Sequence, residues 1–574
     1  MKQISKALLI SALLLTNISI CIGAQTSDLP NIIWITFEDL SPEHLSVYGN
    51  ELVKTPHIDQ LAADGVLFTR AYTVAGVCAP SRSGIITGMH PVSIGTQHMR
   101  TRAIKARFMP QGIPMYDAVL PEEVKAFPEY LRRKGYYSSN NMKEDYQFKA
   151  PVTVWDESSP AASYRNRGPG QAFFSVYNFF ITHESQLMHY PDSLHFLVKE
   201  VAQYIPKYYE DTPTVRKDIA NLFTRVETLD EHVGELIEQL KQDGVYEDSY
   251  IFFFSDHGGN LPWTKREVLE RGTHIPLIVK FPKSSNAGTV EEELVSSVDF
   301  APTVLSLAGV ELPEYLQGRP FLGANNNSPK RKYVYAARDR MDSEVDRVRS
   351  VRDTAYRYVY NYYTDRPKYQ DLKYRKGIPM MKEILDRNKA GILQNPYLSD
   401  WFQTPRVKEE LYHVTEDKDE LQNLAAVSQY RDKLLELRQA FWEWTAHIGD
   451  LSSIPEIEMV SHYMWNGLDK APETKPVQII ETEKGVLLWA PTKGTSIGYR
   501  IVKVGEKPRQ ELHRLNSWDM PLVFGYTKMG VKQEFSGSWN VYQGEYILLH
   551  KGDILEINAM RIGYTPFLTE YHLK

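Results

Sequence analysis

Residues 31–39 read NIIWITFED, an apolar run that stops abruptly at two acidic residues. A largely apolar run without polar alternation is typical of a strand that is buried on both faces of a sheet. The run YIFFFS at residues 250–255 has the same character and stops at an Asp-His pair. A third run, AFFSVYNFF at residues 172–180, ends near His183. These three runs predict central strands of one large sheet.

Helical stretches separate the three runs. Residues 213–242 are an example, and Pro213 suits the first turn of that helix. Strands that alternate with helices indicate an α/β sheet. Polar residues gather where the strands end, and open α/β sheets place their functional sites at that edge.

The pattern of apolar and polar residues changes beyond about residue 330. Residues 332–339 and 351–363 predict strands of a smaller antiparallel sheet, with a helix at 430–448 packed beside it. A β-rich unit begins at about residue 470, after a proline-containing stretch. The expected units are a large domain at 25–330, its C-terminal subdomain at 331–465 and an accessory module at 470–574.

The N-terminus has the pattern of a secretory signal. Lys2 and Lys6 precede apolar runs at residues 7–15 and 18–22. Gly23 and Ala24 are small residues of the kind found at a signal-peptide cleavage site. The runs are too short and too interrupted for a good membrane span. We expect residues 1–24 to be a signal peptide and the mature protein to be periplasmic or secreted.

Composition limits the kinds of function. The chain has 574 residues, of which 42% are hydrophobic, enough for a large buried core. Its net charge is −6 and no strongly basic stretch stands out, which argues against a nucleic-acid partner. Cys21 is expected to leave with the signal, so Cys78 remains without a disulfide partner. Cys78 is therefore either a buried, inert side chain or a chemically active one.

The residues around Cys78 favour the second alternative. They read Cys78-Ala79-Pro80-Ser81-Arg82, and Pro80 suits the first turn of a helix. Cys78 would then lie at a helix N-terminus, where backbone N–H groups and the helix dipole favour negative charge. Arg82 adds a fixed cation. The segment thus predicts a site for an anionic group such as sulfate.

This C-x-P-S-R segment, followed by a helix of small residues, resembles the signature of the formylglycine-dependent sulfatases, and the resemblance covers roughly residues 28–450. It implies an alkaline-phosphatase-like α/β sandwich with a central mixed sheet, a smaller C-terminal antiparallel sheet and an appended β-rich module. It also implies that a maturation enzyme oxidises Cys78 to formylglycine (3-oxoalanine), whose hydrated form attacks sulfur. The chain looks like a polysaccharide sulfatase of a Bacteroidetes-like bacterium.

The resemblance also implies a metal site. The family binds one calcium ion with acidic residues after the first strand, the formylglycine oxygen and a pair of residues after a late strand. Here Glu38, Asp39, Cys78, Asp256 and His257 fill those places. Calcium prefers several oxygen ligands, which suits the three carboxylates. Glu38 departs from the family's usual Asp, and His257 is expected either to bind the metal or to contact sulfate.

The sulfate pocket needs cations and proton donors. Lys143 matches a family lysine that holds sulfate oxygens, and Lys265 matches one that is expected to contact sulfate or the leaving oxygen. The resemblance implies that both act together with Arg82. His183 matches the family histidine that faces the leaving-group oxygen and would protonate it. Asp145 falls where the family usually has a histidine. Either its carboxylate takes the proton of the nucleophile or it is structural.

Two further residues are candidates for substrate contacts. His98 and Arg100 lie shortly after the nucleophile segment, where polar side chains could contact the sugar around the sulfate. The C-terminal β-rich unit resembles modules of carbohydrate-active enzymes. We expect a sulfated polysaccharide as substrate, an ulvan-like algal glycan first and a glycosaminoglycan second. Three alternatives stay open: an N-sulfamidase, a phosphonate or phosphodiester hydrolase of the same superfamily, and a non-catalytic glycan-binding protein.

Overall fold

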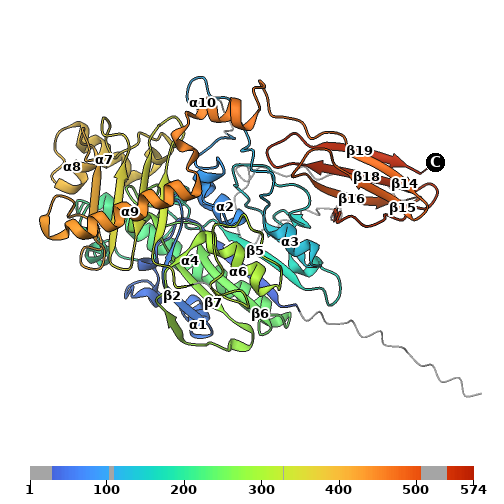
Figure 1. Cartoon of the computed structure of the whole chain (residues 1–574). Coiled ribbons are helices and arrows are strands. Elements are labelled where there is room, and N and C mark those ends of the chain that lie inside the picture. The colour runs from blue at the N-terminus through green and yellow to red at the C-terminus, as the bar shows by residue number, and fades with distance from the viewer. Residues whose placement is uncertain (1–28, 103–108, 328, 506–538, 574) are drawn as a thin grey trace, which may run out of the picture.

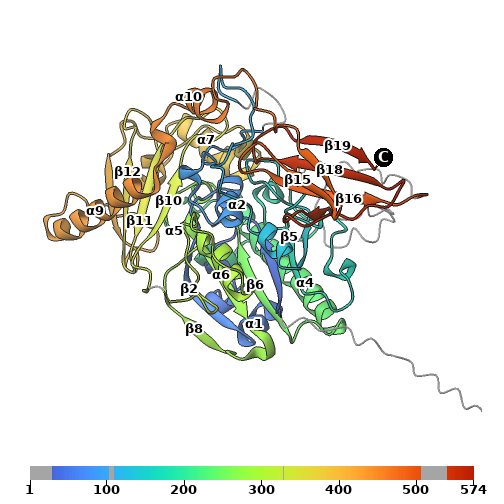
Figure 2. The same cartoon turned by 45° about the vertical axis from the view of Figure 1, so that its right-hand side comes forward.

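Three β-structured parts follow one another along the chain. The computed structural model describes residues 29–102, 109–327, 329–505 and 539–573. A large sheet with helices lies between a second, smaller sheet and a C-terminal β module (Figure 1). Figure 2 shows the same arrangement from another side. The expected signal peptide, with Cys21, lies outside the described residues.

In the part of the chain that the structure describes, the large sheet has nine strands and is mixed. Its order is β4-β3-β5-β1-β6-β7-β2-β8, with β9 paired to β2. Strands β4, β3, β5, β1 and β6 are parallel, whereas β7 is antiparallel to β6 and to β2. The strands are β1 (Asn31–Phe37), β2 (Val66–Tyr72), β3 (Tyr137–Asn141), β4 (Glu157–Ser158), β5 (Phe173–Phe179), β6 (Ser249–Ser255), β7 (His274–Lys280), β8 (Thr289–Glu291) and β9 (Val295–Ser296).

Helices cover both faces of this sheet because its central strands are apolar on both faces. In β1, Ile32 and Trp34 join one hydrophobic core, and Ile33 and Ile35 join the other. Residues of α2, α3 and α6 complete the first core, and residues of α1 and α4 complete the second. These helices and the short α5 are α1 (Pro56–Ala63), α2 (Cys78–Thr87), α3 (Pro128–Arg133), α4 (Pro213–Gln242), α5 (Glu270–Thr273) and α6 (Phe300–Leu307).

The register of the parallel strands brings their carboxyl ends together. Phe37, the last residue of β1, pairs with Ser255 of β6 and with Phe179 of β5. The residues that follow each strand therefore emerge at one edge of the sheet, as expected for an α/β fold. Glu38 and Asp256 are the first residues beyond β1 and β6.

The second sheet is antiparallel, with the order β10-β11-β12-β13, and α9 packs on it. The single strand expected at 351–363 is wrong. The chain turns within that range, because the side chain of Asp353 accepts hydrogen bonds from the backbone N–H groups of Ala355 and Tyr356. The elements are β10 (Val334–Arg338), β11 (Val348–Arg352), β12 (Tyr356–Asn361), β13 (Glu409–His413), α7 (Pro379–Lys389), α8 (Pro396–Trp401), α9 (Arg431–Ile448) and α10 (Glu456–Glu458).

The described residues of the C-terminal module, 470–505 and 539–573, form a hairpin, β14-β15, and a four-stranded antiparallel sheet, β17-β16-β18-β19. The module docks on the segment that contains α3. Ser496 donates a hydrogen bond to Glu129, and Lys125 donates to Ser496 and to the carbonyl of Gly494. Its strands are β14 (Gln478–Thr482), β15 (Gly485–Trp489), β16 (Ser496–Val502), β17 (Asn540–Val541), β18 (Ile554–Met560) and β19 (Phe567–His572).

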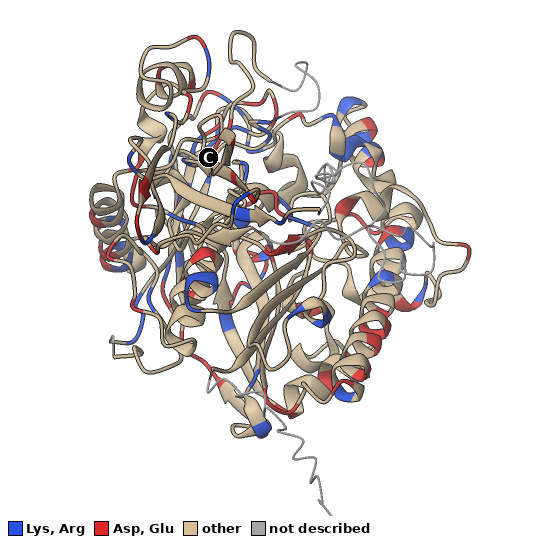
Figure 3. Cartoon of the chain, turned by 90° about the vertical axis from the view of Figure 1, so that its right-hand side faces the viewer, with Lys and Arg blue, Asp and Glu red and all other residues tan. Residues whose placement is uncertain are grey.

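Charge is distributed over the whole chain. Figure 3 shows basic and acidic residues interspersed on the helices and loops, a mixture that is typical of a solvated surface. Among the described residues, no helix has both the length and the apolar character that a membrane span requires.

Candidate active site

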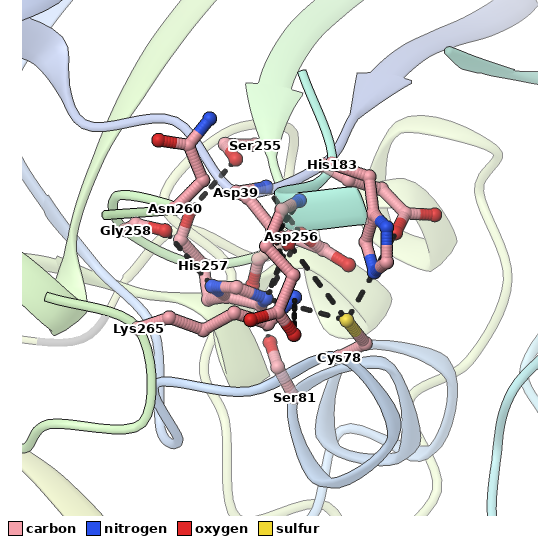
Figure 4. A network of polar contacts seen from close by, with 12 residues as sticks. Asp39, Cys78, Ser81, His183, Ser255, Asp256, His257, Gly258, Asn260 and Lys265 are labelled. Atoms are coloured by element: carbon pink, nitrogen blue, oxygen red, sulfur yellow. Dashed lines mark hydrogen bonds and ion pairs between the residues drawn. The ribbon is translucent and has the colours of Figure 1, made fainter. Parts of the chain in front are cut away.

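The site is built around Cys78, the first residue of α2. Val77 before it is extended and Pro80 lies in the first turn, as the sequence predicts. Ser81 ties this turn to the end of β6 by donating a hydrogen bond to the backbone carbonyl of Asp256. Figure 4 shows Cys78 at the start of the helix, facing side chains that come from several loops.

Two carboxylates from the end of β1 face the Cys78 thiol. Its Sγ lies 3.9 Å from Oε2 of Glu38 and 3.9 Å from Oδ1 of Asp39. In a matured protein the oxygens of formylglycine would stand in the place of this sulfur. Asp39 has a φ of 59°, a left-handed conformation that is uncommon for a residue other than glycine and that clusters at functional sites.

Asp256 and His257, which follow β6, complete the acidic cluster. Nε2 of His257 lies 2.9 Å from Oδ1 of Asp39 and 3.4 Å from Sγ of Cys78. Nδ1 of the same ring lies 2.9 Å from the carbonyl of Gly258, which orients the imidazole. Burial would lower the pKa of His257, but Asp256 and Asp39 outweigh burial and raise the pKa to about 10.

These side chains fit a hard divalent cation. Two groups have their ligand atoms within 4.8 Å of one another: Glu38-Asp39-Cys78-His183 and Cys78-Asp256-His257. Burial raises the pKa of Glu38 above its ordinary value, and the neighbouring acid Asp256 adds to the shift. The cluster thus favours positive charge in its midst, and its carboxylate oxygens are the ligands that calcium prefers.

Buried cations flank the carboxylates. Arg82, on the first turns of α2, has its Nε 2.9 Å from Oδ2 of Asp256, and its Nη1 donates to Asn178 at 2.8 Å. Lys143, which follows β3, has its Nζ 2.5 Å from Oε1 of Glu38. Burial would lower the pKa of Arg82, but Asp256 and Glu38 outweigh it and keep the guanidinium charged.

Lys265 is a third buried cation. Its Nζ lies 2.5 Å from Oδ2 of Asp39 and 3.3 Å from Oε1 of Glu184. Glu184 also pairs through both oxygens with Arg266, and its backbone N–H donates to Asp39 at 2.8 Å. Sequence reasoning missed Glu184 and Arg266. Their only signal is that each directly follows a predicted site residue, and this signal does not separate a buried pair from two solvated charges.

His183 lies four residues beyond β5 and is 3% exposed. Its Nε2 is 3.7 Å from Oε2 of Glu38, and the backbone N–H of Ser185 donates to its Nδ1. Nδ1 also lies 2.8 Å from the hydroxyl oxygen of Ser185. When Nδ1 accepts the backbone hydrogen bond, the neutral ring carries its proton on Nε2, toward the cluster. Burial lowers the pKa of His183 well below its ordinary value, and Lys265 and Lys143 lower it further. A sulfate group bound beside the ring would favour the protonated form.

A small pocket opens beside Cys78. The residues that line it are Cys78, Met99, Arg100, His183, Glu184, Lys265, Arg266, Met341, Asp342 and Leu372. Of the two candidates for sugar contacts, Arg100 thus lies at the pocket.

The structure places His98 elsewhere. Its ring is buried, 3.9 Å from Oε2 of Glu456, and neither ring nitrogen makes a hydrogen bond. Its carbonyl accepts a hydrogen bond from the side chain of Gln147, which holds the backbone with the ring turned inward. His98 therefore lies among the residues that support the pocket wall.

Asp145 lies beside Lys143, with Oδ2 of Asp145 3.7 Å from Nζ of Lys143. Its carboxylate is outside both groups of converging ligand atoms around Cys78. Its φ of 53° is left-handed. This position favours the structural alternative, in which Asp145 helps to orient Lys143.

Comparisons with known proteins agree with this geometry. Residues 30–310 match the family model described as Sulfatase, and residues 258–398 match the model described as N-sulphoglucosamine sulphohydrolase, C-terminal. An ulvan-active sulfatase of Formosa agariphila is 37% identical over 571 residues, which cover 94% of this chain and 90% of that protein. The human N-sulphoglucosamine sulphohydrolase is 27% identical, over 70% of this chain and 87% of that protein.

A solved structure shares the fold. BT1596, a 2-O GAG sulfatase, aligns with a TM-score of 0.54 at 17% identity, covering 75% of this chain and 94% of that chain. This likeness confirms the predicted fold class, with its central mixed sheet and smaller antiparallel sheet. The match to the family model and the long alignment with the Formosa agariphila enzyme show that the chain belongs to the sulfatase family and is a sulfatase.

Proposed function

We propose that the chain hydrolyses sulfate esters on a sulfated polysaccharide or its oligosaccharides, using formylglycine made from Cys78 and one calcium ion. The observation that carries the proposal is the convergence on Cys78 of carboxylates from two strand ends and of three buried cations. A protein that only bound glycan would gain nothing from burying so many charges around one cysteine, because burial of charge is unfavourable.

The carboxylates Glu38, Asp39 and Asp256 would hold the metal. His257 would either join them through Nε2 after losing its proton, or contact sulfate as the charged imidazolium. When bound, calcium supplies a Lewis acid for a sulfate oxygen, and formylglycine supplies the nucleophilic oxygen. The chain keeps this assembly dry and fixed, since the metal-site side chains are at most 2% exposed. Fixed charges in a water-excluded site act more strongly on a developing charge than the same groups do in water.

The chain's own cations and its histidine supply the remaining chemistry. Arg82, Lys143 and Lys265 stand around Cys78, where they can neutralise the oxygens of a sulfuryl group during transfer. In its protonated form, which a bound sulfate favours, His183 would donate the proton of Nε2 to the leaving-group oxygen and become a neutral imidazole.

The substrate class is proposed from the relatives and from the C-terminal module. The curated relative with 37% identity is named for activity on ulvan, which supports an ulvan-like algal glycan ahead of a glycosaminoglycan. The predicted signal peptide at 1–24 supports export to the periplasm or beyond, and a maturation enzyme is the implied partner. We propose that catalysis resides in residues 25–330 and 331–465, and that the module at 470–574 is accessory.

A second candidate is an N-sulfamidase, which would cleave a sulfamate S–N bond. The model that matches residues 258–398 and the human relative both carry the name N-sulphoglucosamine sulphohydrolase, which supports this candidate. The same cluster of carboxylates and cations would serve either bond, because the transferred sulfuryl group is the same.

One experiment separates the candidates. The chain is co-expressed with a formylglycine-generating enzyme and incubated with O-sulfated ulvan oligosaccharides, N-sulfated glucosamine oligosaccharides and a phosphate diester. Released sulfate and phosphate products are quantified by ion chromatography. We expect sulfate from the O-sulfated glycan. Release from the N-sulfated glycan alone would favour the sulfamidase, and an inactive matured protein would contradict both candidates.

A further inference from the structure

The outer wall of the pocket carries two charged residues that the chemistry at sulfate does not use. Arg100 and Asp342 line the same pocket as Cys78, and Nε of Arg100 lies 3.1 Å from Oδ1 of Asp342. Their side chains are 12% and 10% exposed, so the pair is largely withdrawn from solvent yet faces the pocket.

Two segments that are far apart in the sequence bring this pair together. Met99 and Met341 form a β-bridge between the segments, and the N–H of Met99 donates to the carbonyl of Arg340 at 2.9 Å. Nη1 of Arg340 donates to the carbonyls of Met99 and Asp342, and its guanidinium pairs with Glu456. Each segment therefore contributes a methionine and the charged residue that follows it to the pocket lining. Arg340 joins the two segments through its hydrogen bonds to Met99 and Asp342.

The backbone at this wall is held in an unusual conformation. The φ angle is 63° at Arg100, 48° at Asp342 and 78° at the neighbouring Arg266. Left-handed conformations are unfavourable for residues with a Cβ atom, and they persist where the surrounding structure fixes them, often at ligand sites. The Arg100 guanidinium also lies 4.8 Å from the centre of the Tyr374 ring, a contact that restrains its plane.

We propose that Arg100 and Asp342 form a subsite for a second anionic group of the substrate, a carboxylate or a further sulfate near the scissile sulfate. The proposal rests on the proposed function, because it assigns the wall of the same pocket. A planar guanidinium binds such anions through parallel N–H donors. Met99, Met341 and Leu372 line the same pocket and offer apolar surface to the C–H face of a sugar ring.

Asp342 and the incoming anion would compete for the same guanidinium. In the free protein the carboxylate of Asp342 keeps Arg100 in place. When a substrate anion pairs with Arg100, Asp342 becomes available to accept a hydrogen bond from a sugar hydroxyl. Loss of Arg100 should therefore weaken binding of an anionic sugar, whereas loss of the Asp342 charge should strengthen it. A purely structural ion pair would give effects of the same sign.

The test compares the matured wild type with the variants Arg100→Gln and Asp342→Asn. Three substrates are used: a sulfated oligosaccharide that contains a uronate, the same compound after reduction of its carboxyl group to an alcohol, and an analogue with a second sulfate in place of the uronate. We expect Arg100→Gln to raise KM for the substrate that carries the preferred anion by roughly 10-fold to 100-fold, as for loss of a charge-assisted hydrogen bond. We expect Asp342→Asn to lower that KM and both variants to leave kcat nearly unchanged.

The comparison of the substrates identifies the anion. Effects that vanish on carboxyl reduction indicate a carboxylate, and effects confined to the disulfated analogue indicate a second sulfate. Arg100→Lys should retain part of the affinity because it keeps the charge. Thermal unfolding of each variant checks that it is folded. KM changes of the same sign in both variants, or equal changes on the reduced substrate, would overturn the subsite. A matured wild type that releases no sulfate from any substrate would overturn the proposed function and the subsite with it.

Discussion

Cys78 determines whether the site has a nucleophile. Because it is the first residue of α2 and faces two carboxylates at 3.9 Å, we expect active protein to carry formylglycine at this position. Intact-mass measurement checks the replacement of the thiol. Cys78→Ala should lower turnover by at least roughly 1,000-fold, as for loss of other nucleophiles, while the chain remains folded. Cys78→Ser should be active only with a serine-type maturation system. A free thiol on fully active protein would contradict the prediction.

Asp39 and Asp256 should determine metal content. Both carboxylates are buried among other acids, so removal of the ion or of either charge should impair the site. We expect a chelator to stop turnover, calcium to restore it, and Asp39→Asn or Asp256→Asn to lower bound calcium measured by elemental analysis. Glu51→Gln, at an exposed acid, is the matched control and should retain the metal. Full activity after verified removal of the metal would argue against these ligands.

Among single residues, the sequence predicts the candidate site best where a motif assigns a residue to it. The resemblance to the sulfatases predicts Glu38, Asp39, Asp256 and His257 as metal ligands after two strands, and the register of β1 with β6 explains why these residues meet. Asp342 had no signal, because the bridge between Met99 and Met341 that brings it to the pocket is a tertiary contact. For His98, the sequence position predicts a contact with substrate, but the ring is buried beside Glu456 instead.

Among the elements, the turn at residues 264–272 positions Lys265 and Arg266. A Cβ atom at Gly272 would lie 2.3 Å from the carbonyl oxygen of Glu267 and 2.7 Å from that of Thr264, both backbone atoms. The turn would have to shift. We expect Gly272→Ala to lower kcat/KM by about 100-fold, because small displacements of catalytic groups are costly. Steady-state assays with thermal unfolding check this.

Gly168→Ala is the control for that substitution. The nearest atom to a Cβ at Gly168 is a side-chain oxygen of Gln171 at 3.4 Å, so little has to move. This variant should keep wild-type activity. Equal activity of Gly272→Ala and wild type would show that the turn tolerates the displacement and that the position of Lys265 is not limiting.

Elements with strong local signals were predicted well, and the others required the structure. The helix at 213–242 has a capping Thr212 and Pro213 in its first turn, so local chemistry defines its start. The range 351–363 lacks a glycine or proline to mark its turn, and a side chain, Asp353, makes the turn instead. The sequence pattern therefore predicts one strand where the structure has two, β11 and β12.

In the molecule as a whole, specific contacts join the C-terminal module to the part that carries Cys78. Glu129 of α3 is buried and accepts hydrogen bonds from Thr153 and from Ser496 of the module. Gly494 and Gly563 approach the backbone of residues 118–122 so closely that a Cβ at either would clash. The module is thus packed against the same unit that carries the pocket, which keeps its position relative to the site defined.

The lining of the pocket should favour a large substrate over a small one. The lining of the pocket beside Cys78 includes apolar and charged side chains in addition to the residues proposed to hold sulfate, and we expect a large substrate to contact them where an aryl sulfate does not. Binding energy from such remote contacts can be used to raise kcat/KM. We expect matured protein to hydrolyse a sulfated oligosaccharide with a kcat/KM at least roughly 100-fold higher than that for a small aryl sulfate. Parallel steady-state assays, with sulfate release as the common readout, measure the ratio. Faster turnover of the aryl sulfate than of every glycan tested would show that the pocket walls are not a sugar site.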